Sequence, residues 1–278
     1  MKSRTTMKID RSKRCISAAF AVVLLLSSIS ARAQSFIAAP ESLPGGLSYQ
    51  QWSAKWWQWL WSIPVSINPV FDTTGADCAV SQPSGPVWFL AGTFGTNVTR
   101  TCSIPAGKRI FFPIINLGQD YPCLDVSQTP PHLRKDPNFQ PGPGQSLEQF
   151  LTIGYGPVLV SGHLVTYCGA RQFIDHVTAV SASLDGVAIQ DLLLPPETSK
   201  YRATSPLFVF DGDESWVTTK SDTCAGPGHK AVSDGYWIML KPLPPGPHTL
   251  VFSGTEAFPS DSCGPTFMVT VTYYLTVG

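Results

Sequence analysis

The acidic stretch that begins at Asp211 has the residue types that come closest to a metal site. Oxygen-bearing side chains fall there at positions 1, 3, 5, 9 and 12 of a calcium-binding loop. Two features weaken the match, because Trp216 stands where the sharp turn needs glycine and Asp222 has a shorter side chain than the usual glutamate. The stretch predicts a weak calcium site at Asp211, Asp213 and Asp222, with an ordinary acidic surface turn as the alternative. No other cofactor is indicated.

Two tryptophans have the types and spacing of a stacking surface. Trp57 and Trp61 are four residues apart, so that a helix would place them side by side, away from the stripe of its other aromatic residues. Two exposed rings in this arrangement would stack on a sugar, a lipid or a partner. The alternative is that another part of the chain, such as a proline-rich loop, covers them, since tryptophan is usually mostly buried.

The common catalytic signatures are absent from this sequence. It contains no His-Glu-x-x-His, no Gly-x-Ser-x-Gly, no Walker loop and no dinucleotide-binding glycine pattern. The leading hypothesis is therefore a non-enzymatic protein that binds a surface ligand, above all a glycan. One alternative is an extracellular polysaccharide hydrolase or lyase with carboxylates such as Asp211, Asp213 or Glu214, which spacing alone cannot test because such carboxylates meet only in three dimensions. Another is a structural component of the envelope.

The amino terminus has the layout of a secretory signal peptide. A basic stretch is followed by an apolar run at residues 16–29 and by Ala31-Arg32-Ala33. The run is shorter than the roughly 20 residues that span a bilayer, and no later segment is long enough. We expect cleavage after Ala33, export to the periplasm or the outside of the cell, and no transmembrane span in the mature chain. An uncleaved membrane anchor is the alternative.

Removal of residues 1–33 changes the charge of the chain. The full sequence has 19 basic and 19 acidic residues, and residues 34–278 have 12 and 18. The mature chain is acidic and has no basic stripe, so nucleic acid is excluded as a partner. A glycan or another envelope ligand remains.

The cysteines predict a disulfide framework. The same cleavage leaves an even number of them, which in an exported chain indicates three bridges. No Cys-x-x-Cys or zinc-like spacing competes with this interpretation. Sequential pairing is our preferred choice among the fifteen possible connectivities: Cys78–Cys102, Cys123–Cys168 and Cys224–Cys263.

Two helices are predicted from their capping residues. The Trp-rich segment 47–62 has Ser48 and Gln51 in capping-box positions and ends before Pro64. Its residues Tyr49, Trp52, Trp56, Trp59 and Leu60 share one face, which should point into the core. A shorter helix over residues 146–153 has a second capping box.

The remaining pattern is that of a mainly β protein. Strands are predicted at residues 87–93, 109–116, 158–166, 177–184, 207–210, 236–240, 248–254 and 267–277, which are rich in β-branched and aromatic residues. Asp185-Gly186 predicts a two-residue hairpin turn. We expect a single antiparallel β-sandwich over residues 34–278, with the jelly roll as one candidate arrangement. Residues 128–145 are interpreted as a proline-rich loop within this domain.

Several motifs carry a resemblance to known sequences. They are Trp56-Trp57-x-Trp59, Val87-Trp-Phe-Leu-Ala-Gly92, Arg100-x-Cys102-x-Ile-Pro-Ala-Gly-Lys108 and Asp234-Gly-Tyr-Trp-Ile-Met-Leu-Lys-Pro-Leu243. With these motifs the chain resembles a family of uncharacterised exported bacterial proteins. The resemblance implies an envelope or extracellular location and supplies no catalytic residue.

Overall fold

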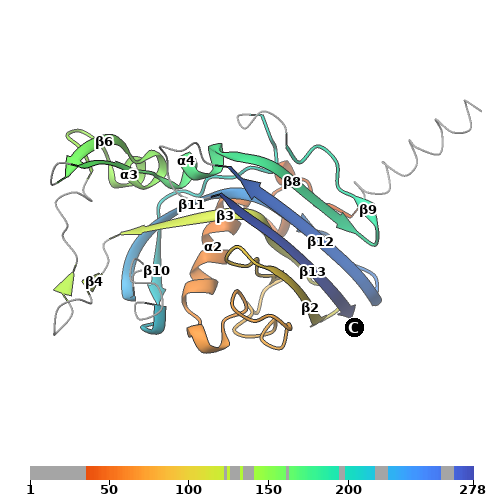
Figure 1. The fold of residues 1–278 in the computed structure, drawn as a ribbon. Coiled ribbons are helices and arrows are strands. Elements are labelled where there is room, and N and C mark those ends of the chain that lie inside the picture. The colour runs from red at the N-terminus through yellow and green to blue at the C-terminus, as the bar shows by residue number, and fades with distance from the viewer. Residues whose placement is uncertain are drawn as a thin grey trace, which may run out of the picture.

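The structure is a computed structural model that describes residues 36–121, 124–125, 132–133, 141–160, 163–193, 198–216, 225–257 and 266–278. The predicted signal peptide, residues 1–33, and most of the proline-rich segment 128–145 lie outside the described residues. The described chain is mainly β, as predicted, with two main sheets and a Trp-rich helix (Figure 1). None of its helices is long and apolar enough to cross a membrane.

Sheet A curves around the Trp-rich helix (Figure 1). In spatial order its strands are β1 (Val87–Phe89), β3 (Arg109–Tyr121), β11 (Gly226–Leu240) and β10 (Phe208–Gly212). β3 and β11 pair in antiparallel fashion, whereas β1 runs parallel to β3 and pairs with residues 109–111 alone. Beyond Phe111, the outer edge of β3 therefore has no strand partner among the described residues.

Sheet B packs against the other face of sheet A. In spatial order its strands are β2 (Asn97–Ile104), β13 (Phe267–Val277), β12 (Gly246–Glu256), β8 (Val177–Leu184) and β9 (Val187–Ala188). The ring centroids of Phe112 and Phe252 lie 4.9 Å apart across the interface. Gly254 allows a close approach of the two sheets, because a Cβ atom there would lie 2.7 Å from that of Ile115.

The smaller elements surround these sheets. Two hairpins pair β4 (Leu124–Asp125) with β5 (His132–Leu133) and β6 (Tyr155–Val160) with β7 (His163–Tyr167). The helices are α2 (Tyr49–Trp61), α3 (Leu147–Ile153), α4 (Ala170–Asp175) and the short 3-10 turns Pro40–Ser42, Pro44–Gly46 and Val65–Ile67. A second, small core cluster joins α3 and α4 to β11 through Phe150, Leu151, Ala170 and Val232.

Both predicted helices are confirmed with their caps. The Ser48 hydroxyl accepts from the Gln51 backbone N–H and the Gln51 side chain accepts from the Ser48 N–H, which completes the capping box of α2. Ser146 and Gln149 do the same for α3. All five residues of the expected core stripe of α2 are buried. The capping positions succeeded as predictors because they satisfy backbone groups locally, whatever the helix packs against.

The prediction of a purely antiparallel sandwich is wrong for two strand pairs. β1 runs parallel to β3, and β2 runs parallel to β13. β2 was not predicted at all, because its inward positions include the charged residue Arg100, which breaks the expected alternation. Local turns such as Asp185-Gly186, which has the positive φ angles of a tight hairpin, indicate only antiparallel neighbours. Parallel pairs join strands that are distant in sequence, so no turn signal precedes them.

The described disulfide agrees with the predicted pairing. Cys78 and Cys102 are bonded, and their Cα atoms lie 5.9 Å apart. Cys168 is also disulfide-bonded. Cys123, Cys224 and Cys263 lie outside the described residues, so their pairing stays a prediction.

Candidate functional site

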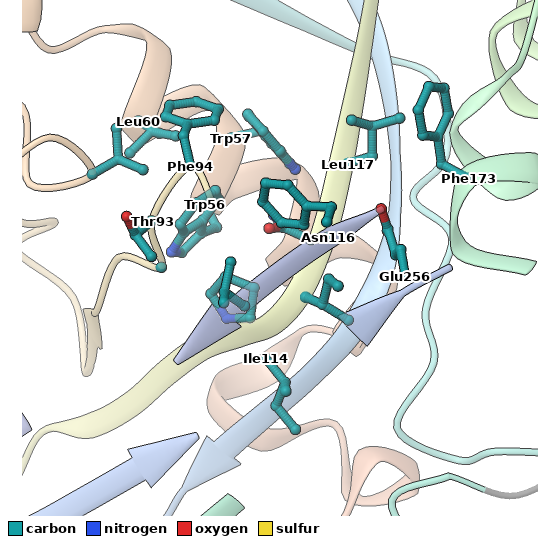
Figure 2. A pocket seen from close by; sticks show the side chains of 16 residues that line it. Trp56, Trp57, Leu60, Thr93, Phe94, Ile114, Asn116, Leu117, Phe173 and Glu256 are labelled. Carbon is teal, nitrogen blue, oxygen red and sulfur yellow. The ribbon is translucent and has the colours of Figure 1, made fainter. Parts of the chain in front are cut away.

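A cavity of about 220 Å³ lies at the unpaired edge of β3, between α2 and the end of sheet B (Figure 2). Its wall is mostly apolar and aromatic. The lining residues are Trp56, Trp57 and Leu60 of α2, Val70, residues 92–94, residues 113–117 of β3, Phe173 of α4, Glu256 of β12, and Phe267 and Val269 of β13.

A bulge in β3 shapes one wall of this cavity. Trp237 pairs with Pro113 and Tyr236 with Ile115, so Ile114 is an extra residue without an opposite partner. The insertion reverses which side chains face each side of the sheet. Ile115 consequently packs against Gly254 of sheet B, and Gly118, three residues on, lies against the rings of α2. Asn116 is two residues before Gly118, so its side chain points to the same face of the sheet, toward α2.

The aromatic wall that α2 contributes is held firmly in place. The Trp56 indole N–H donates to the Leu90 carbonyl at 2.9 Å, and its ring meets Trp237 at 5.5 Å between centroids. Trp57 packs edge-on against Trp56 at 5.2 Å. The indole N–H of Trp57, however, is buried without a hydrogen-bond partner in the described structure.

Glu256 brings a carboxyl group into this apolar surrounding. The residue is 5% exposed and lies where β12 and β8 change register, between Thr255 and Glu256. Burial raises the pKa of its carboxyl group to about 8, and no charge or hydrogen bond among the described residues offsets that effect. Near pH 7 the group is therefore mostly a neutral acid, which can donate a hydrogen bond.

Three polar groups of the cavity wall thus lack partners in the described structure. They are the Trp57 indole N–H, the buried amide nitrogen of Asn116 and the carboxyl group of Glu256. In Figure 2 the Trp57 nitrogen and the carboxyl end of Glu256 both point toward the region around Asn116 and Leu117. Buried polar groups are nearly always hydrogen-bonded in proteins. An apolar cavity with three unpaired groups has the properties of a small-molecule site.

The exposed platform expected of Trp57 and Trp61 is not found, because the two side chains are 6% and 3% exposed. Their rings pack against β3 at Gly118, where a Cβ atom would lie 2.8 Å from each of them. Phe210 of β10 covers Trp61 at 4.3 Å between ring centroids. The alternative of coverage by the chain itself therefore agrees with their burial, and among the described residues it is β3 and β10 that cover the rings. Trp57 lines the cavity and Trp61 does not.

The predicted calcium residues are placed only in part. Asp211 accepts a hydrogen bond from the Gly228 N–H, and Asp213 accepts from the N–H and hydroxyl of Ser215. Trp216 is 1% exposed, with its indole N–H bonded to Ile63, so this loop anchors the end of α2. Within the described ranges no group of three potential metal ligands is found. Asp222 lies outside them, so calcium binding stays a prediction.

The carboxylates considered for a hydrolase lie away from the cavity. Asp211 and Glu214 are exposed, and neither they nor Asp213 line the cavity wall. Within the described part of the cavity wall, Glu256 is the one carboxyl group. A glycosidase would need a second carboxyl group facing the first.

Other buried charges serve to hold the fold. Arg100 is 1% exposed and donates to four backbone carbonyls and to the Tyr273 hydroxyl, thereby joining β2 to the loops beside it. Arg202 pairs with Asp234 at 2.6 Å and with Asp175 at 2.7 Å. Because these groups are well supplied with partners, they are structural.

Glu256 and Asn116 are not among the site residues predicted from the sequence. A signal for Glu256 exists, because Leu250, Phe252, Gly254 and Glu256 alternate on the buried face of β12. The predicted strand ends at Gly254 and so does not include the acid at the end of the inner face. No comparable signal exists for Asn116, since its orientation depends on the bulge at Ile114.

Comparison with known proteins does not identify a relative of this chain. No protein-family model, no curated protein and no solved structure matches the chain. The resemblance to exported bacterial proteins accordingly stays a prediction.

Proposed function

We propose that this protein is an exported, non-enzymatic binding protein that holds a small, largely apolar molecule in the cavity beside β3. The observation that carries the proposal is the combination of an aromatic wall with three unpaired polar groups. Dry apolar cavities bind apolar molecules, and polar groups in the wall select among them. A surface glycan is less well supported, since the rings expected to stack on it are buried.

The cavity volume limits the size of the ligand. An apolar cavity of 150 Å³ holds benzene, so 220 Å³ suits a molecule of about nine non-hydrogen atoms. Such a molecule is a substituted benzene or a short branched aliphatic compound.

Export rests on the amino terminus and on the cysteines. A buried disulfide between Cys78 and Cys102 is typical of proteins that fold in an oxidising compartment. We expect the exported protein to begin at Gln34, because Ala31 and Ala33 have the sizes that signal peptidase requires. We also expect three disulfides and no free thiol.

Intact mass spectrometry of the secreted protein, with and without reduction, tests both expectations. The reduced mass should match residues 34–278, and reduction should add about six hydrogen masses, two for each bridge. A chain that keeps residues 1–33, or one with two or more free thiols, would contradict the proposed export route.

Filling the cavity should remove ligand binding without harming the fold. Val269 lines the cavity, so Val269→Phe places a ring in space that is now open. We expect this variant to bind isopropylbenzene, a hydrocarbon of nine carbons, at least tenfold more weakly than the natural protein. An NMR titration of the two proteins measures the difference.

Two neighbours on β13 serve as matched controls for this experiment. Met268 is 55% exposed, so Met268→Phe should leave both binding and stability unchanged. Val271 is fully buried and does not line the cavity, so Val271→Phe should lower the free energy of unfolding by about 1–3 kcal/mol through overpacking. The proposal fails if the natural protein binds no probe, or if Val269→Phe binds as well as Met268→Phe.

A further inference from the structure

We infer, on the basis of the proposed function, that the cavity selects a neutral carbonyl compound over a hydrocarbon of the same shape. Trp57, Asn116 and Glu256 would receive the carbonyl oxygen. The inference names the chemical class of the ligand and the three residues that recognise it.

The first argument comes from the indole groups of α2. Trp52, Trp56 and Trp59 donate to backbone carbonyls at 2.7, 2.9 and 3.1 Å. Trp57 sits among them and has no acceptor in the described structure. An indole N–H can only donate, so the missing partner must be an acceptor. Trp88 and Trp237 also lack acceptors, but they do not line this cavity.

The second argument comes from Glu256. A neutral carboxylic acid offers an O–H donor, and the wall around this one is apolar. The amide of Asn116 adds a buried N–H group without a partner in the described structure. All three groups can donate at neutral pH, and a single carbonyl oxygen with two lone pairs can serve two of them at once.

The charge of the wall argues for a neutral ligand. Among the described residues that line the cavity there is no lysine, arginine or histidine, so an anionic ligand would lose its hydration without gaining a cation from them. A cationic amine could pair with an ionised Glu256. It would, however, leave the N–H groups of Trp57 and Asn116 without acceptors. A neutral acceptor avoids the desolvation cost of an anion and pairs with more of these N–H groups than a cation does.

Ionisation of Glu256 should oppose carbonyl binding. Above its pKa, which burial raises to about 8, the group becomes an acceptor and repels the ligand oxygen. Charged and titratable residues on the neighbouring elements do not line the cavity. They are Lys55 of α2, Asp120 of β3, Arg171 and Asp175 of α4, and His176 before β8. Asp175 is paired with Arg202, and the His176 ring hydrogen-bonds to the Gln172 carbonyl.

Four probes of nine non-hydrogen atoms test the inference on the full mature protein. Acetophenone carries a carbonyl group, isopropylbenzene replaces its oxygen with carbon, 1-phenylethylammonium carries a cation and benzoate an anion. NMR titrations at pH 6.5 should give at least tenfold tighter binding for acetophenone than for each of the others, since each buried hydrogen bond contributes up to about tenfold. Between pH 6.5 and 9.5 the affinity for acetophenone should fall at least threefold.

Two substitutions of Glu256 distinguish recognition of the carbonyl oxygen from an effect of cavity shape. Glu256→Gln keeps an N–H donor that does not titrate, so the preference for acetophenone should persist and become independent of pH. Glu256→Leu removes one of the three donors and leaves the N–H groups of Trp57 and Asn116, so the preference for acetophenone should fall at least threefold below that of Glu256→Gln without disappearing. The two variants have similar volumes, so loss of the preference in both would indicate a change in shape and overturn the inference.

The possible outcomes distinguish this inference from the proposed function. Equal binding of acetophenone and isopropylbenzene would overturn the carbonyl preference and leave an apolar binding protein. Tightest binding of the ammonium or of benzoate would overturn it in favour of an ionic ligand. Binding of none of the four probes would overturn the proposed function and, with it, the inference.

Discussion

Replacing Trp61 with alanine is expected to lower the free energy of unfolding by about 3–5 kcal/mol, which is the usual cost of removing a large buried aromatic side chain. The ring is 3% exposed and packs against Trp57 at 4.5 Å, Phe210 at 4.3 Å and Phe208 at 6.2 Å between centroids. Its removal would leave a cavity between α2 and β10 that the surrounding strands cannot fill.

Denaturant unfolding of Trp61→Ala measures this cost. Tyr274→Ala is the matched control, because this aromatic side chain on β13 is 52% exposed and should contribute little. Native-like stability of Trp61→Ala would mean that the ring is free to contact a ligand, as a surface platform requires. Strong destabilisation would place Trp61 in the core and exclude that platform.

The second large effect is a dependence of stability on pH that comes from Glu256. Burial raises the pKa of its carboxyl group from 4.5 to about 8, so the folded protein holds this proton more tightly than the unfolded chain does. The resulting stabilisation is fully present below pH 4.5 and is lost as the pH rises through 8. The loss amounts to about 3–5 kcal/mol at about 1.4 kcal/mol for each pH unit.

Comparison with Glu256→Gln isolates this contribution from those of the other titrating groups. At pH 4 the two proteins should differ little, since the acid and the amide are both neutral there. At pH 8.5 the glutamine variant should be more stable than the natural protein by about 3–5 kcal/mol. A difference that stays constant from pH 4 to pH 8.5 would show that the carboxyl group is hydrated or paired, and would remove it from the cavity wall.

These two experiments test two parts of one packing arrangement, namely helix α2 and the end of β12. Sheet A curves around α2 (Figure 1), Trp61 packs against Phe208 and Phe210 of β10, and Trp57 of the same helix lines the cavity. The bulge at Ile114 turns Asn116 toward the helix, and the change of register at the end of β12 leaves Glu256 at the opposite wall. The cavity is therefore a consequence of packing between elements that are far apart in the chain.

The elements themselves follow closely from the sequence. The capping boxes at Ser48 and Ser146, the hairpin turn at Asp185-Gly186 and the strands β8 and β13 agree with their predictions, and the first cysteine pair is bonded as expected. Each of these features depends on residues that are near one another in sequence, or on alternation along one strand.

Burial of Trp57 and Trp61, the two parallel strand pairs and the candidate site were decided only by the tertiary structure. Helical spacing places the two rings on one face of α2. Whether that face is covered depends on strands that are distant in sequence, because Gly118 and Phe210 follow Trp61 by 57 and 149 residues. Glu256 is a second example. The alternation along β12 predicts that its side chain points inward, but its raised pKa depends on apolar neighbours from β3 and β13. Local sequence determines how a segment folds, and burial and pKa depend on what packs against it.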